Sequence, residues 1–295
     1  MPRRVSLPAP WVDTVPRMPD WITSARPEGD ERFRAGAALA VLDQVLAHDD
    51  VPAALLRARL ALSAACACVQ ILGRHDGPND LRDAVHLLRA GDRPGPAGIV
   101  FTQWLRAIDA PVSTHLPSDC LPSDMADRAS DWQAEATGAP IDCATQVLHA
   151  ALSAFPRQET AALILADATL ARQLGWPHVV PLLAAGLTPS DLSQTGPELS
   201  AACHRALTGA SIQAAGLAAD LASRAARLRR VAPKLRARGA GRAVDRFLAR
   251  DALSPSIALT DLMSDRAARR LCDRLVSLDA IREFSGRSSF RLYGL

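Results

Sequence analysis

The residues best suited to do chemistry are arginines near the end of the chain. A guanidinium group is always charged, and its fork of N–H donors can pair with a phosphate or with the edge of a guanine base. A cluster of such side chains predicts contacts with double-stranded DNA. The residues assigned to this role are Arg236, Arg238, Arg266, Arg269, Arg270, Arg274 and Arg287.

A helix followed by a hairpin is expected to position these arginines. Ser264 can cap a helix with its hydroxyl, and the apolar residues after it recur at helical spacing. Residues 281–284 and 288–293 then favour two strands, with a turn at 285–287. A basic helix that leads into a hairpin is typical of a winged helix-turn-helix. The same pattern also fits a small subdomain used for packing or dimerisation.

Within a winged helix, some of these arginines are expected to contact bases and others to contact phosphates. Arg266, Arg269 and Arg270 fall in the first turns of the helix, from which side chains reach base edges in the major groove. Arg287 falls at the tip of the hairpin, beside the phosphates. The sequence alone does not say which of the three helical arginines faces the groove.

The charge distribution favours the same function. Residues 224–295 hold 17 Arg or Lys and 7 Asp or Glu, whereas the whole chain has a net charge of only +3. The preceding residues are therefore acidic overall and are not expected to bind DNA. A basic segment on an acidic body is the electrostatic pattern of a nucleic-acid-binding protein. The alternative is a solvated helix end and linker in a protein that uses arginine throughout.

Composition predicts an all-α fold, a multi-helix, bundle-like body with a C-terminal winged helix-turn-helix whose small β-hairpin forms the wing. Alanine and leucine dominate, only 4% of the residues are aromatic, and few segments alternate in polarity. Helical spacing predicts helices over 158–174 and over 197–231, the latter either continuous or a pair broken near Gly209. One short helix is expected over 179–185, and the second helix of the last part of the chain over 255–262. The expected parts are a proline-rich arm (1–34), a helical body (35–232) and the winged helix (233–295). Neither a signal peptide nor a membrane-spanning run is predicted, so a cytoplasmic location is expected.

A second candidate site is an anion site formed by Arg89, Arg93, Gly95 and Gly98. The same residues can be explained without a ligand, because they end one helix and begin the next. A weaker alternative is an enzyme with a pocket lined by Asp83, His86 and Arg93. Neither a catalytic motif nor metal-ligand spacing is present, so neither an enzymatic activity nor a metal or cofactor is expected. Asp167 falls near an apolar helix face and is expected to pair with an arginine.

Three stretches resemble a bacterial family, domain-of-unknown-function family 1403. They are LRDAVHLLRAGDRPGPAG (81–98), LADATLARQLGWPHVVPLLA (165–184) and the pair VAPKLRARGAG (231–241) and MSDRAARRLCDRLVSLDAIREFSGRSSFRLYGL (263–295). The last of these is also similar to the winged helix that ends many Fic-type AMP-transferases. Those enzymes carry an HPFxxGNGR loop, which this chain lacks. The resemblance therefore implies the DNA-binding ending and not the transfer activity.

Together these observations predict a DNA-binding protein that regulates transcription or a plasmid or other mobile element. Double-stranded DNA is the expected partner, and a homodimer is a further possibility. The alternative is a non-catalytic helical protein-interaction module whose basic tail contacts a protein.

Overall fold

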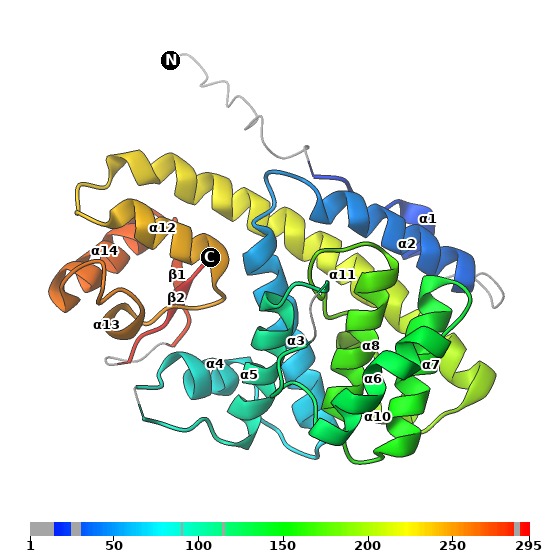
Figure 1. Ribbon diagram of the computed structural model, residues 1–295. Helices are drawn as coiled ribbons and strands as arrows, with labels where there is room; N and C mark the ends of the chain where they lie inside the picture. The colour runs from blue at the N-terminus through cyan, green and yellow to red at the C-terminus, as the bar shows by residue number, and fades with distance from the viewer. Residues whose placement is uncertain (1–14, 25–30, 90, 114–115, 286–289) are drawn as a thin grey trace.

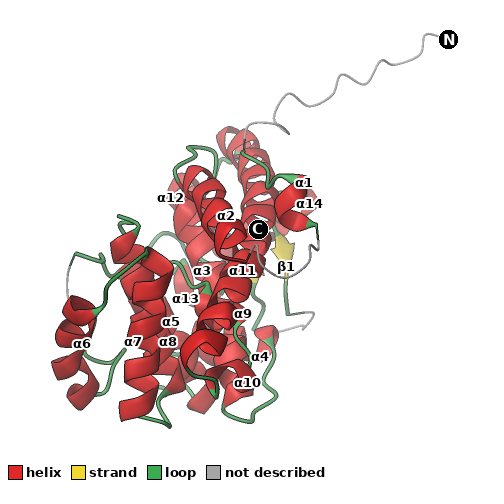
Figure 2. Cartoon of the chain, turned by 90° about the vertical axis from the view of Figure 1, so that its right-hand side faces the viewer, coloured by secondary structure: helices red, strands yellow, loops and turns green. Residues whose placement is uncertain are grey.

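The fold is almost entirely helical (Figure 2). The computed structural model describes residues 15–24, 31–89, 91–113, 116–285 and 290–295. The helices that precede the last part of the chain are α1 (Asp20–Thr23), α2 (Glu31–Leu46), α3 (Ala53–Ile71), α4 (Pro78–His86), α5 (Pro96–Asp109), α6 (Ser123–Glu135), α7 (Pro140–Ala154), α8 (Glu159–Gln173), α9 (Leu183–Gly186), α10 (Pro189–Leu192) and α11 (Gly196–Val231). The all-α prediction is confirmed.

The longest helix, α11, connects the two ends of the molecule (Figure 1). Its 36 residues span about 54 Å at 1.5 Å per residue. Leu207, Leu221 and Leu228 lie on its buried side, and α2 packs along it. The helix continues through Gly209, where the sequence allowed a break. One continuous helix therefore runs from the body to the last part of the chain.

The core of the body is built around α3 and α8. The side chains of α3 are mostly buried between α5, α9 and α11, and those of α8 pack against α7. By length and composition α3 could cross a membrane, but 61% of its most apolar window is buried inside the protein. Helix α3 therefore belongs to the hydrophobic core.

Asp167 of α8 is fully buried, but its partner is not an arginine. Its carboxylate accepts hydrogen bonds from the backbone N–H groups of Leu182 (3.2 Å) and Leu183 (2.9 Å). These amides are free because residues 179–182 are not helical and α9 begins only at Leu183. The prediction of an arginine partner was wrong, as was that of one helix over 179–185.

The described part of the C-terminal unit, residues 233–285 and 290–295, contains three α-helices and a small antiparallel sheet. After the 3₁₀ turn η1 (Ala232–Lys234) come α12 (Ala240–Ala249), α13 (Pro255–Ala258) and α14 (Asp265–Ser277), then β1 (Arg282–Glu283) and β2 (Tyr293–Gly294). Arg282 pairs with Gly294 and Glu283 with Tyr293. Tyr293 also bridges to Leu253, which lies between α12 and α13.

The second helix of this unit is shorter than the 255–262 that the sequence predicts. It ends at Ala258 because Arg246 of α12 donates to the Ala258 carbonyl, which a continuing helix would use for its own amide. The same guanidinium forms two 2.6 Å hydrogen bonds with Asp261. The chain from Leu259 to Met263 turns instead, and α14 begins in a new direction.

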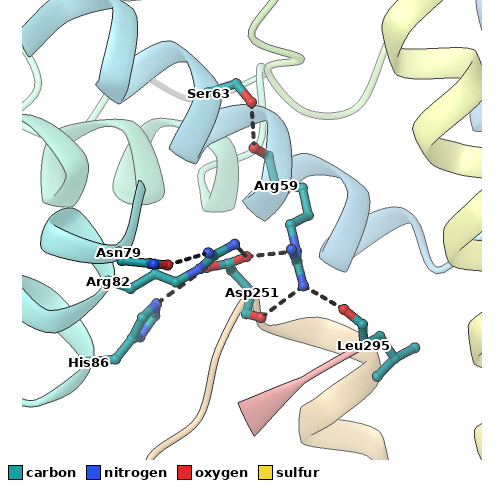
Figure 3. A network of polar contacts seen from close by, with 7 residues as sticks. All are labelled: Arg59, Ser63, Asn79, Arg82, His86, Asp251 and Leu295. Atoms are coloured by element: carbon teal, nitrogen blue, oxygen red, sulfur yellow. Dashed lines mark hydrogen bonds and ion pairs between the residues drawn. The ribbon is translucent and has the colours of Figure 1, made fainter. Parts of the chain in front are cut away.

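A buried ion network joins the C-terminal unit to the body (Figure 3). The Asp251 side chain has no exposed surface. Its carboxylate accepts hydrogen bonds from Arg82 of α4 at 2.7 and 3.0 Å, and Arg59 Nε of α3 lies 2.6 Å from it. Arg59 also donates to the backbone oxygen of Leu295 at 2.8 Å. The network fixes the C-terminal unit on α3 and α4.

Phe284 and Gly294 complete this junction. The Phe284 ring lies 5.0 Å from the Arg59 guanidinium carbon and 4.4 Å from that of Arg82, distances that allow cation–π attraction. A Cβ atom at Gly294 would meet both the Asp251 carbonyl oxygen and the Phe284 ring at 2.5 Å. The hydrophobic core runs continuously from the body into this unit. The division of the chain at residues 34 and 232 stays a prediction.

Candidate nucleic-acid interface

Helix α14 presents the central arginines of the candidate site. Ser264 caps it as expected, its hydroxyl accepting a hydrogen bond from the Ala267 amide at 3.4 Å. Its apolar side, which includes Leu271 and Leu275, is buried. The other side is exposed. Residues four apart share a helix face, so the exposed arginines form the stripe Arg266, Arg270 and Arg274.

This stripe forms one wall of a groove. The opposite wall is the loop 234–237, and the groove between them has a volume of about 620 Å³. Gly239 holds this loop close, because its φ of +84° and its approach to the Leu262 carbonyl leave no room for a side chain. The cationic side chains that line the groove are Lys234, Arg236, Arg266, Arg270 and Arg274.

Two acids near the groove, Asp261 and Asp265, pair with arginines outside it. Asp261 pairs with Arg246, whose guanidinium holds the pKa of that carboxyl below its usual range. Asp265 pairs with Arg269 at 3.0 Å. The groove cations, by contrast, form no ion pair among residues 15–24, 31–89, 91–113, 116–285 and 290–295. Their charge is available to an anion from outside.

The N-terminus of α14 adds to this positive field. Ser264 lines the groove, and the N-terminal amides of α14 other than the capped Ala267 amide lie beside it. Five cations and a helix N-terminus on two facing walls suit an extended polyanion better than a single small ion. The arrangement can hold several phosphates in a row.

The groove thus brings together four of the arginines that the sequence assigned to DNA. Lys234, its fifth cation, was not among them, although it lies in the acid-free block 224–242. Arg238 is exposed but does not line the groove. Arg269 lies on another side of α14, in a cavity of about 200 Å³ with Asp273 and Arg291. Arg287 lies outside the described residues.

The residues of the candidate anion site have other contacts. Gly98 lies where α5 crosses α4, and a Cβ atom there would come within 2.8 Å of Pro94 and 3.1 Å of Ala84. The Arg89 amide donates to Asp92, and its guanidinium lies 6.0 Å from the Phe290 ring. Arg93 and Gly95 are exposed. Packing accounts for Gly98, while anion binding there stays a prediction.

His86, the centre of the weaker enzymatic alternative, belongs to the Asp251 network. Its Nε2 lies 3.9 Å from an Asp251 carboxylate oxygen, and its ring meets Phe101 edge-on. Burial lowers the pKa of His86 to about 4. Sequence reasoning assigned no role to Asp251, because both of its arginine partners lie far from it in the chain.

The architecture and the groove define a mainly helical protein with an exposed basic face at its C-terminal end, whose groove cations form no ion pair within the described residues. The chain belongs to the family described as "Protein of unknown function (DUF1403)", whose model matches residues 9–295. The resemblance to family 1403 is thereby confirmed. Neither a curated protein nor a solved structure matches the chain.

Proposed function

We propose that the protein binds double-stranded DNA through the groove between loop 234–237 and α14. The observation that carries this proposal is the set of groove cations without acidic partners in the described chain. Duplex DNA carries a dense line of phosphates, and it releases condensed counterions when a protein neutralises them. Arginines without an acidic partner gain binding free energy from this counterion release, whereas arginines already paired with an acid do not.

We further propose that the C-terminal unit is a winged helix-turn-helix, with α14 as its recognition helix. The order α12, α13, α14, β1, β2 is that of such a domain, and the bridge from Leu253 to Tyr293 fits its third, short strand. In this arrangement α14 enters the major groove and the hairpin lies along the backbone. Arg287 of the hairpin keeps its proposed phosphate contact.

The groove divides the arginines of α14 by role. Arg270 and Arg274 face the cationic loop, and a phosphate strand between these two walls satisfies both. We therefore assign them to the backbone. Arg269 lies outside the groove and remains the candidate for base readout, although its pairing with Asp265 must first be released. We also propose that the protein regulates transcription or a mobile element. It would bind DNA as a homodimer in the cytoplasm.

The test is a titration of the full-length chain against a fluorescent random-sequence duplex at several salt concentrations. Log affinity should fall with log salt by about 0.9 for each phosphate neutralised. Arg270→Gln and Arg274→Gln should each reduce the slope by about one contact. Arg205→Gln is the matched control, because Arg205 lies on α11 in the body and pairs with Glu31.

Affinity that does not change with salt would refute the proposal. Equal binding by the parent protein and both groove variants would do the same. In that case the basic face instead contacts an acidic protein surface.

A further inference from the structure

A second cavity, of about 290 Å³, lies at the junction between α11 and the C-terminal unit. One side is formed by residues between 220 and 227 of α11, and the other by residues 279–282 and Leu295. Neither part of the chain forms the cavity alone. It therefore exists only while the C-terminal unit is docked, and a ligand in it would contact both sides.

Arginines outnumber acids around this cavity. Arg224 pairs with Asp220 at 2.9 Å, and Arg227 of α11 pairs with Asp279 across the junction. These two pairs use both side-chain carboxylates of the cavity wall. Arg282 of β1 is left without an ion pair in the part of the chain that the structure describes.

The buried side of the junction adds to this imbalance. Arg59 and Arg82 share the single carboxylate of Asp251, and the Phe284 ring lies 5.4 Å from the Arg282 guanidinium carbon. Burial, and then the neighbouring Arg224, lower the pKa of Arg282. The Arg282 side chain is exposed, so its charge can be reached from solvent, and it lies close to other positive charges that repel it. An anion in the cavity would offset this repulsion.

We propose that the junction cavity binds a small anion with two or more negative charges, with Arg282 as its main partner. A phosphate-bearing or polycarboxylate compound has this chemistry. The volume is at the lower end of the range for ligand pockets, about 300–1,000 Å³, and so suits a compact molecule. Arg224 lies beside Arg282 and can add a second guanidinium contact, while the Ser223 hydroxyl can donate one hydrogen bond.

The consequence is a site at which a small molecule stabilises the docked arrangement. The anion binds the folded junction and not the unfolded chain, so it raises stability by mass action. If the C-terminal unit binds DNA as proposed above, a small molecule at this site would hold the DNA-binding unit in its docked position. Anion binding itself does not depend on that function.

The test is thermal unfolding of the full-length chain without DNA, in phosphate, pyrophosphate or citrate, at an ionic strength matched with sodium chloride. At about ten times the dissociation constant, a binding anion should raise the midpoint by about 2–4 °C over chloride. A rise of the midpoint in phosphate and pyrophosphate indicates a phosphate-bearing ligand, and a rise in citrate indicates a polycarboxylate. Arg282→Gln should weaken binding at least about tenfold.

Two further variants keep the result interpretable. Arg224→Gln should also weaken binding, and it serves if Arg282→Gln does not fold. Arg270→Gln changes the basic groove only, so it should keep the full response. If no anion acts beyond chloride, or if Arg270→Gln removes the response while Arg282→Gln keeps it, the junction site does not exist. The DNA titration is a separate measurement, so the two proposals can fail independently.

Discussion

Replacing Asp251 by asparagine should destabilise the protein strongly. The substitution keeps the shape of the side chain but removes the carboxylate that Arg59 and Arg82 share. The Asp251 side chain is fully buried, and the two arginine side chains are each only 10% exposed. Breaking a buried ion pair from one side costs about 3–5 kcal/mol, because the remaining charge stays desolvated.

Urea unfolding of the full-length chain measures this cost. With a denaturant slope of about 3 kcal/mol/M, the loss corresponds to a fall in the midpoint of at least about 1 M urea. Asp261→Asn is the matched control. Asp261 also binds an arginine bidentately, but its side chain is 54% exposed, so the midpoint should hardly move.

A double-mutant cycle tests whether the ion pair is the cause. Arg82→Gln alone should also be costly, and the double variant should lose less than the sum of the two single losses, since both remove the same contact. A loss below about 1 kcal/mol for Asp251→Asn would show that the buried network does not hold the junction together.

The remaining predictions concern three glycines and one buried acid. Gly98→Ala should cost about 1–3 kcal/mol because its Cβ crowds Ala84, whereas Gly216→Ala, in an open part of α11, should stabilise by up to about 1 kcal/mol; urea unfolding of both variants checks the contrast. Gly294→Ala should lower the thermal midpoint more than Gly98→Ala, since its Cβ would meet two groups at 2.5 Å, and an unchanged midpoint would contradict the junction geometry. Burial raises the pKa of Asp167 to about 7, above the ordinary 3.8, so the folded chain keeps a proton that the unfolded chain releases. Its contribution to stability is therefore present below pH 4 and is lost as the pH rises to 7; unfolding free energies across this range should show a decline that Asp167→Asn reduces.

The sequence was most informative where structure depends on neighbours along the chain. Helical spacing predicted residues 158–174 and 197–231, and the observed helices are α8 at 159–173 and α11 at 196–231. The cap at Ser264 was equally local. In each case the apolar period and the flanking residues suffice, because they determine both the helix and the face that it buries.

Contacts between distant segments were not predictable in this way. Arg82 and Asp251 are 169 residues apart, and nothing near either residue indicates the other. The partner of Asp167 is the backbone of a turn, which leaves no trace in residue type. The sequence grouped Arg266, Arg269 and Arg270, whereas the structure places Arg269 on another side of α14. The position of the stripe opposite Lys234 and Arg236 depends on how the loop before α12 folds back.

The Asp251 network also determines when the protein can finish folding during its synthesis. Asp251 emerges 192 residues after Arg59 and 169 after Arg82. At about 5–20 residues per second, the second interval lasts roughly 10–30 s. Throughout that time the two arginines of α3 and α4 lack their carboxylate, and burying them unpaired is costly. The region around α3 and α4 should therefore stay open to solvent on the ribosome and close only when the last part of the chain arrives.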